Sequence, residues 1–182
     1  MHARPTTLIL LLIVFGCSRG VNPENEVAVK QIHQSGIKTD TTTEFRSRIG
    51  NSIVLPSQWT AEDKGDTFIL TSPDSYATIN IFSFTVEGSG TIADFRELMV
   101  AQVPGEWKES EWEEVDFDGV PGQKRRLTSV DENAEAAWCV YVLQTGQFYH
   151  ALILRSWEAM MVLNGGFYEE CIRSFKGVSE TQ

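Results

Sequence analysis

Basic residues are scarce in this sequence, and their shortage excludes one large class of function. Lysine and arginine together number 15 against 25 aspartate and glutamate residues, which gives a formal net charge of -10. Because affinity for nucleic acid comes from clustered lysine and arginine, this balance argues against a nucleic-acid-binding protein. The composition is 42% hydrophobic and 10% aromatic, which excludes a mostly disordered chain, and 182 residues leave room for one domain and little more.

Histidine is also rare, which limits the catalysis that the chain can perform. His2 and His33 lie near the N-terminus, and His150 stands alone in the expected body. Nucleophilic catalysis needs a base beside a nucleophile and a third group that orients the base. The sequence contains no phosphate-binding loop, dinucleotide motif or zinc-protease motif. We therefore expect a protein that is not an enzyme, in which His150 is a half-buried strand residue with an ordinary hydrogen bond.

Cysteine occurs three times, and the body holds two of these residues, Cys139 and Cys171. Cys139 lies in an apolar strand, and Cys171 lies on a helix face that is expected to cover the sheet. A disulfide needs Cα atoms within about 4.4–6.8 Å, so either the two residues are closely apposed and bonded or they are separate buried thiols. The separate thiols are the favoured interpretation. Two cysteines without a neighbouring histidine do not make a zinc site, and we expect no metal or other cofactor.

Long apolar runs are absent, apart from a short one at Leu8–Phe15. Eight helical residues cover about 12 Å, far less than the roughly 30 Å of a hydrocarbon core, so this run is the core of a signal peptide and not a membrane span. The following residues, Val14-Phe15-Gly16-Cys17, resemble the lipobox of bacterial lipoproteins. That resemblance implies cleavage after Gly16 and a diacylglycerol on Cys17. The alternative is an ordinary secretory signal that happens to contain a cysteine.

Acidic residues concentrate between Glu106 and Asp118, where seven carboxylates accompany one lysine. The favoured interpretation is a charged hairpin in which residues 113–116 lie across a turn from the basic run 124–126, because opposite charges on paired strands stabilise a hairpin. The alternative is an acidic surface that steers a basic partner.

Two tryptophans, Trp107 and Trp112, lie among these acids, in a stretch with no continuous apolar face. Tryptophan most often packs inside a domain, but an exposed tryptophan among polar residues is a common anchor of an interface. The candidate partner-binding residues are Trp107, Trp112, Glu111, Glu113 and Glu114.

The remaining pattern predicts an α+β fold, an antiparallel sheet covered by helices. Alternating and apolar segments bounded by turn residues predict strands near residues 45–55, 67–71, 76–86, 112–117, 122–130, 137–143 and 148–157. Thr91 and Asp94 form a variant capping box before a helix whose apolar face holds Ile92, Phe95, Leu98, Met99 and Val103. A C-terminal helix is expected to begin after Gly165 and Gly166, because glycine weakens a helix.

Three short motifs resemble the Mog1/PsbP-like (DcrB-like) domains. Ile53-Val54-Leu55-Pro56 followed by Trp59 resembles their opening, the run 118–122 resembles their G-x-x-G hairpin, and Ile172-Arg173-Ser174-Phe175 resembles their closing I-x-x-S-F. The resemblance covers Phe45 to Lys176 and implies an α/β/α sandwich. The commonly described members are not enzymes, so it also implies a binding role, by analogy of fold.

We therefore divide the chain into a signal peptide at 1–16, a lipidated cysteine and flexible tether at 17–43, a domain at 44–177 and a tail at 178–182. The expected protein is a lipid-anchored, palmitate-bearing module of the bacterial cell envelope, on the periplasmic face of a membrane, with Ser18 favouring the outer membrane. Its expected partner is another envelope protein that binds the segment from Glu106 to Asp118. The alternative function is a carrier of a small apolar ligand or lipid, held between helix and sheet near Phe95, Met99 and Phe167.

Overall fold

The computed structural model describes residues 41–65, 67–85, 90–130 and 136–178. All of them belong to the second of two units into which the chain divides, Asp40–Gln182. The predictions for the signal peptide, Gly16, Cys17 and the tether up to residue 40 lie outside the described residues. None of the helices among the described residues is long and apolar enough to cross a membrane.

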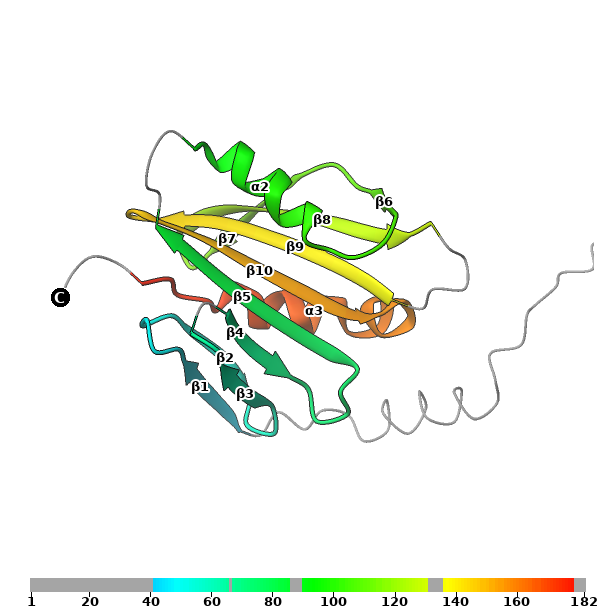
Figure 1. Cartoon of the computed structure of the whole chain (residues 1–182). Coiled ribbons are helices and arrows are strands. Elements are labelled where there is room, and N and C mark those ends of the chain that lie inside the picture. Colours follow the sequence, from blue (N-terminus) through cyan, green and yellow to red (C-terminus); the bar gives the residue numbers. More distant parts are fainter. Residues whose placement is uncertain (1–40, 66, 86–89, 131–135, 179–182) are drawn as a thin grey trace, which may run out of the picture. The chain divides into compact units, whose positions relative to one another are not determined.

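An eight-stranded antiparallel sheet forms the centre of the fold (Figure 1). Its strand order is β3-β4-β5-β10-β9-β8-β6, and β7 also pairs with β8. The strands are β3 (Thr60–Asp63), β4 (Thr67–Thr71), β5 (Ala77–Thr85), β6 (Trp107–Glu109), β7 (Glu113–Phe117), β8 (Val120–Ser129), β9 (Ala136–Thr145) and β10 (Phe148–Trp157). The middle strands bury residues on both faces because each face is covered.

Two helices cover opposite faces of this sheet. Helix α2 (Ile92–Ala101) packs on β9 and β10, and α3 (Glu158–Arg173) packs on the other face of the same strands. Side chains alternate along a strand, so in β9 Val140 and Val142 join the core under α2, while Tyr141 and Leu143 join the core under α3. The predicted α+β class and the α/β/α layering are therefore confirmed.

The single strand expected over residues 45–55 is wrong, because the chain forms a hairpin there. Strand β1 (Thr42–Arg46) pairs with β2 (Ser52–Pro56) in a separate two-stranded sheet. Gly50 has a φ of +96° and donates its N–H to the carbonyl of Ser47 at 3.0 Å, which closes the turn. Glycine adopts this left-handed conformation without a steric cost. Strand β1 begins two residues before the boundary placed at residue 44.

The expected start of the C-terminal helix after its two glycines is also wrong. Helix α3 begins at Glu158 and runs through Gly165 and Gly166 to Arg173. Its first half buries Met160 and Met161 against the sheet, and burying two such side chains outweighs the cost of about 1 kcal/mol for each glycine in a helix.

In α2 the capping box is confirmed, since the side chains of Thr91 and Asp94 each accept from the other's backbone N–H. The expected apolar face is partly wrong, because Leu98 is 55% exposed while Phe95, Met99 and Val100 are buried. Two strands that were not expected, β3 and β6, are short segments at the edges of the sheet.

Candidate functional site

Trp107 and Trp112, expected as exposed anchors, are partly buried residues of the core under α2. Trp107 packs edge-on against Trp138, with ring centroids 6.0 Å apart, and its indole N–H donates to the carbonyl of Val103 at 3.4 Å. Of the two interpretations of these tryptophans, the structure favours packing inside the domain. The local sequence showed no apolar face because α2 and Trp138, which supply that face, are distant in the sequence.

The ring of Trp112 lies beneath two arginines. The guanidinium of Arg125 is 4.6 Å from the ring centroid and that of Arg96 is 5.2 Å away, which are cation–π distances. Arg125 is only 13% exposed at its side chain, and it pairs with Glu109 at 2.5 Å and with Glu97 at 3.8 Å. The arginines on this side of the domain are thus drawn inward, while their carboxylate partners face the solvent.

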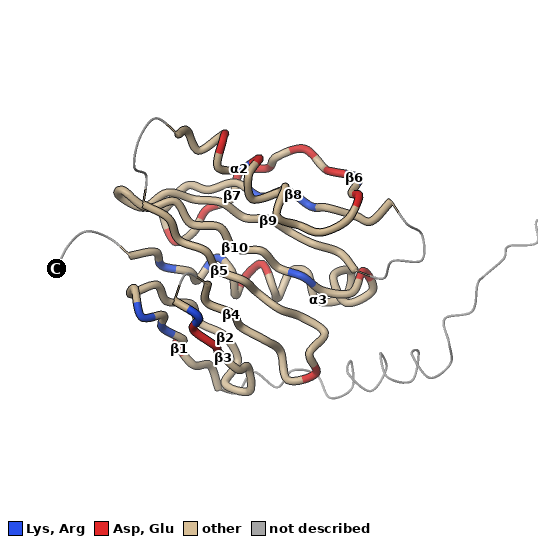
Figure 2. Tube along the Cα trace, in the orientation of Figure 1, with Lys and Arg blue, Asp and Glu red and all other residues tan. Residues whose placement is uncertain are grey.

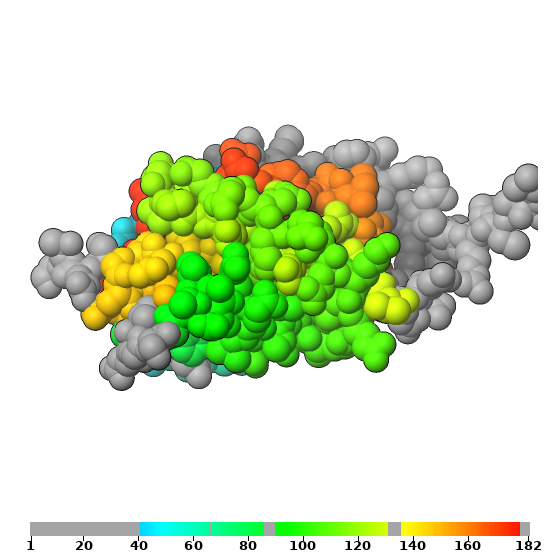
Figure 3. Space-filling model, turned by 90° about the horizontal axis from the view of Figure 1, so that it is seen from above, coloured from blue at the N-terminus to red at the C-terminus, as the bar shows by residue number. Residues whose placement is uncertain are grey.

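We call the exposed surface around these pairs the acidic face, and it consists of Asp94, Glu97, Leu98, Glu109 and Glu114. Glu114 belongs to it because it accepts from Gln123, which in turn bonds Arg96 of α2. Figure 2 shows the acidic residues along α2 and the segment that leads to β6. In Figure 3, which views this face, α2 and the segment that follows it lie side by side as one surface. Glu111 is exposed in the linker between β6 and β7.

The predicted charged hairpin is confirmed for the pair of Glu113 and Lys124, and it is wrong for Arg125 and Arg126, which pair elsewhere. Glu113 of β7 lies opposite Lys124 of β8, and their charged atoms are 3.4 Å apart. Arg125 instead reaches Glu97 and Glu109 on the α2 side, and Arg126 pairs with Glu158 at the start of α3. Neighbouring residues of a strand point to opposite faces, so the three consecutive cations cannot all meet the same carboxylates.

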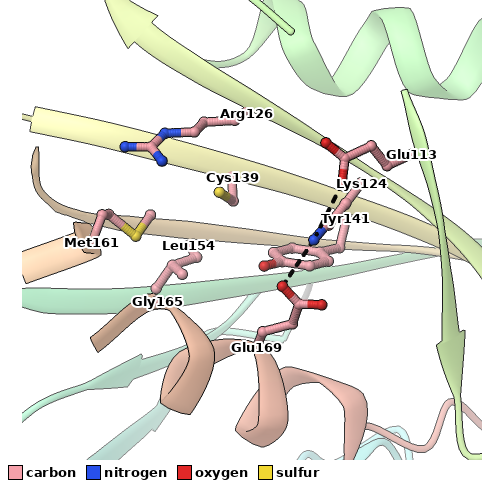
Figure 4. Close-up of a pocket in the computed structure, with 9 residues that line it drawn as sticks. All are labelled: Glu113, Lys124, Arg126, Cys139, Tyr141, Leu154, Met161, Gly165 and Glu169. Carbon is pink, nitrogen blue, oxygen red and sulfur yellow. Dashed lines mark hydrogen bonds and ion pairs between the residues drawn. The ribbon is translucent and has the colours of Figure 1, made fainter. Parts of the chain in front are cut away.

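On the other face, a cavity of about 210 Å³ lies between α3 and the sheet. Strands β7 to β10 supply one wall, and three residues spaced four apart along α3 supply the other (Figure 4). The residues that line it are Glu113, Lys124, Arg126, Cys139, Tyr141, Leu154, Met161, Gly165 and Glu169. Of these, the sequence indicated Glu113, Lys124 and Arg126 as charges of the hairpin, and Cys139 as a strand residue. The signals that could have found the rest are the four-residue spacing on α3 and the alternation along β8 and β9.

Lys124 is the central charge of this cavity. Its ammonium donates to Glu169 at 2.8 Å and lies 3.4 Å from Glu113. Burial opposes the charge of Lys124, but the hydrogen bond and the charges of the two carboxylates outweigh burial and raise its pKa. Burial likewise opposes ionisation of Glu169, but hydrogen bonds from Lys124 and Arg173 outweigh it, so the pKa of Glu169 is lowered.

Cys139 and Cys171 are both free thiols. The two thiols are therefore separate, as favoured, and the disulfide does not form in the structure, but only Cys171 is buried and Cys139 is partly buried. Burial raises the pKa of Cys139 to about 11 and that of Cys171 to about 12. Burial also raises the pKa of Tyr141, the neighbour of Cys139 in the cavity wall. At neutral pH these groups are uncharged, and a thiol is a poor nucleophile in that state.

His150 is fully buried rather than half-buried, and both of its ring nitrogens are bonded. Nδ1 lies 2.8 Å from the hydroxyl of Ser83, and Nε2 lies 2.6 Å from the hydroxyl of Thr145. Thr145 donates its hydroxyl proton to the carbonyl of Val178, so its oxygen must accept from Nε2–H. The N–H of Val178 donates to Oδ1 of Asn51, so the Asn51 amide N–H donates to Ser83, and Ser83 donates to Nδ1.

These five residues form a closed ring of hydrogen bonds that requires the neutral Nε2–H tautomer of His150. A Cβ at Gly177 would lie 2.4 Å from Nε2, so only glycine allows the chain to pass this close. This hydrogen-bonded ring holds the end of the described chain against the sheet and occupies both nitrogens of His150. Among the described residues, no group of three or more His, Cys, Asp and Glu residues could hold a metal ion.

The ligand pocket expected near Phe95, Met99 and Phe167 is wrong, because these residues lie on opposite faces of the sheet. Phe95 and Met99 belong to the core under α2, whereas Phe167 packs against the core under α3. The cavity lined by Tyr141 and Met161 lies on the α3 side.

Solved structures with the same arrangement of strands and helices are known. Cyanobacterial PsbP (CyanoP) from Synechocystis has a TM-score of 0.60 at 14% identity, covering 79% of this chain and 96% of that chain. The fold is that of PsbP and Mog1. The Ran-binding protein Mog1p of Saccharomyces cerevisiae has a TM-score of 0.53 at 12% identity, covering 76% of this chain and 96% of that chain. A mutant of the protein Mog1 has a TM-score of 0.54 at 12% identity, covering 77% and 97%.

Neither a family model nor a curated protein matches the sequence. Identities this low establish the fold alone.

Proposed function

We propose that this protein is a lipid-anchored component of the bacterial envelope that acts as a non-catalytic binding or assembly module. In this proposal Cys17 carries the lipid, the domain hangs on the periplasmic side of the outer membrane, and the partner is another envelope protein with a basic surface. The partner binds the acidic face. The observation that carries the proposal is that this face exposes its carboxylates, while Arg125 between them is largely withdrawn from solvent.

The exposure of each charge supports a role in recognition. The side chains of Glu97 and Glu109 are 61% and 45% exposed, whereas that of Arg125 between them is 13% exposed. A partner therefore meets a negative surface whose neutralising cations lie behind it. Such a surface speeds the encounter with a basic protein and fixes its orientation. Glu97 and Glu109 share the single guanidinium of Arg125, so each can also form an ion pair with a lysine or arginine of a partner.

Leu98 supplies the apolar contact in this proposal. It is 55% exposed and lies on α2 beside Glu97, so a partner that docks on the carboxylates covers it. An apolar centre within a polar rim is the usual anatomy of an interface. Trp112 supports the same surface from below, because it holds Arg96 and Arg125 in place. The tryptophans are therefore supports of the surface and not its contact residues.

The fold is compatible with this role. Mog1p is a Ran-binding protein and has the same fold, which supports protein binding by analogy only. The lipobox-like run ending in Gly16-Cys17 supports the anchor, and the net negative charge keeps the domain away from anionic headgroups, so that it hangs from its lipid.

A photocrosslinking experiment in intact cells tests the proposal. A photoreactive amino acid replaces Leu98 in the full-length protein, and in a matched control it replaces Val162, which is 71% exposed on α3 at the opposite face of the sheet. We expect one dominant adduct with an envelope protein from position 98 and none from position 162. We also expect Glu97→Lys together with Glu114→Lys to reduce the adduct at least fivefold while the melting temperature stays nearly unchanged. Equal adducts at both positions, or an adduct insensitive to charge reversal, would refute binding at the acidic face.

A further inference from the structure

The size of the cavity under α3 limits what can occupy it. Its volume is about 210 Å³. A protein cavity of about 150 Å³ lined by aliphatic and aromatic groups binds benzene. The cavity therefore has room for one substituted ring.

Gly165 keeps this cavity open. It lies in the interior of α3, where glycine is the least favourable residue apart from proline. Apart from the neighbouring residues and backbone of α3 itself, no heavy atom lies within 4 Å of the position that its Cβ would take, so packing does not require glycine there. Met161 and Glu169, one helical turn away on either side, both line the cavity, so a side chain at position 165 would point toward the same space.

The wall offers apolar surface and uncharged hydrogen-bond donors. Leu154 and Met161 supply the apolar surface. The hydroxyl of Tyr141 points into the space in Figure 4, and the thiol of Cys139 lies beside it. Burial raises the pKa of both groups, so they keep their protons at neutral pH, and a side-chain hydrogen bond links the Tyr141 hydroxyl to the Cys139 sulfur. Sulfur is a weak acceptor, so an oxygen acceptor on a ligand would displace it as the partner of the Tyr141 hydroxyl. A fitting molecule therefore carries an acceptor such as a carbonyl or ether oxygen.

The charges of the wall are already matched with one another. Lys124 lies between Glu113 and Glu169, and Glu169 also accepts from Arg173 at 2.6 Å. Arg126 pairs with Glu158 at the other end of the cavity. An ionised ligand would add an unpaired charge to this partly buried site, which is unfavourable. An uncharged molecule avoids that cost.

We infer that this cavity is a binding site for an uncharged organic molecule of the size of one substituted ring, with one hydrogen-bond acceptor directed at Tyr141. The ring lies against Leu154 and Met161, and the absence of a side chain at Gly165 leaves room for it. The site is on the α3 side of the sheet, so it is independent of the acidic face and goes beyond the proposed binding function.

Titration of the domain with acetophenone, followed by the methyl resonance of Met161 in NMR spectra, tests this inference. Acetophenone carries one ring and one carbonyl acceptor. We expect a saturable shift of the Met161 resonance. Benzoate, which has the same size but a negative charge, and palmitate, which is much longer, are expected to bind at least tenfold more weakly. Comparable binding of benzoate would refute the assignment of an uncharged ligand, and comparable binding of palmitate would refute the limit on size.

Two glycines that neighbour each other in α3 provide a matched pair of variants. Gly165→Leu fills the cavity, whereas Gly166→Leu changes an exposed glycine that does not line it. Both changes remove a helix-interior glycine with open space around it, so both variants should fold. We expect Gly165→Leu to weaken acetophenone binding at least tenfold and Gly166→Leu to leave it within twofold. Equal effects of the two changes would overturn the site.

Tyr141→Phe tests the acceptor contact without changing the shape of the wall. Loss of one hydrogen bond should weaken acetophenone binding about fivefold. Unchanged affinity in this variant would contradict the assignment of the acceptor to Tyr141.

Discussion

His150 couples the protonation of a single buried ring to the packing of several chain segments. Its ring lies 5.3 Å from that of Phe175 and near that of Phe148, and its two nitrogens join the closed ring of hydrogen bonds. The sequence predicted that His150 lies in a strand and makes a hydrogen bond, and both parts of this prediction are confirmed. It could not predict full burial, because Ser83 and Val178 come from strand β5 and the C-terminal segment, which are distant in the sequence.

The buried imidazole of His150 makes the stability of the domain depend on pH. Burial lowers the pKa of His150 to about 4 from an ordinary value of 6.5. The unfolded chain therefore binds a proton as the pH falls through 6.5, while the folded chain does not until about pH 4. The stabilisation by the neutral ring is complete above pH 6.5 and is lost as the pH falls toward 4. We expect the free energy of unfolding to decrease by about 2 kcal/mol from this source between pH 7 and pH 4.5, measured by urea unfolding.

His150→Gln separates this effect from the carboxylates that also titrate in acid. The variant is less stable at every pH because the hydrogen-bond ring is altered, but its unfolding free energy should fall less between pH 7 and pH 4.5 than that of the parent. A variant that shows the same fall as the parent would mean that His150 does not contribute to the pH dependence.

At the scale of the elements, local patterns predicted those whose signals are complete within a few residues. Strand β10 matches its expected bounds, 148–157, because a turn at Thr145–Gly146 and an apolar run define it. Helix α2 begins where its capping box predicts. The predicted bounds are wrong where contacts with distant parts of the chain determine the element. Helix α3 extends through two glycines because Met160 and Met161 are buried beneath it. The pairing that places β5 beside β10, 67 residues apart at Ser83 and His150, has no local signal at all.

The capping box of α2 also fixes the position of Asp94, which is part of the acidic face. Thr91 accepts from the N–H of Asp94, and its own N–H donates to the Asp94 carboxylate at 2.9 Å. Thr91→Ala removes the side-chain acceptor and should lower the free energy of unfolding by about 1 kcal/mol, measured by urea unfolding. Thr91→Ser keeps the hydroxyl and should stay within a few tenths of a kcal/mol of the parent. Equal losses in both variants would show that the methyl group of Thr91, and not the cap, is responsible.

At the scale of the whole molecule, the sheet separates two surfaces of different chemistry. The α2 side exposes carboxylates in front of partly buried arginines, and the α3 side contains a cavity with balanced charges. The excess of acid was visible in the composition. Which carboxylates find a cation on each side of the sheet depends on the alternation of Lys124, Arg125 and Arg126 between the two sides of β8. The candidate site was therefore predictable as an acidic segment, and its division between two faces required the fold.

The proposed lipid anchor depends on one residue, Cys17, and can be tested there. We expect Cys17→Ser to abolish labelling with radioactive palmitate and to release the protein from the membrane fraction. The melting temperature of the domain should not change, because residues 41–178 supply the buried cores on both faces of the sheet. Ser18→Asp is the matched variant: it keeps the lipid, and by resemblance to proteobacterial lipoproteins it should move the protein from the outer to the inner membrane in fractionated envelopes. A Cys17→Ser protein that stays membrane-bound and labelled would contradict the lipid anchor, and a Ser18→Asp protein that stays in the outer membrane would contradict the sorting role of Ser18.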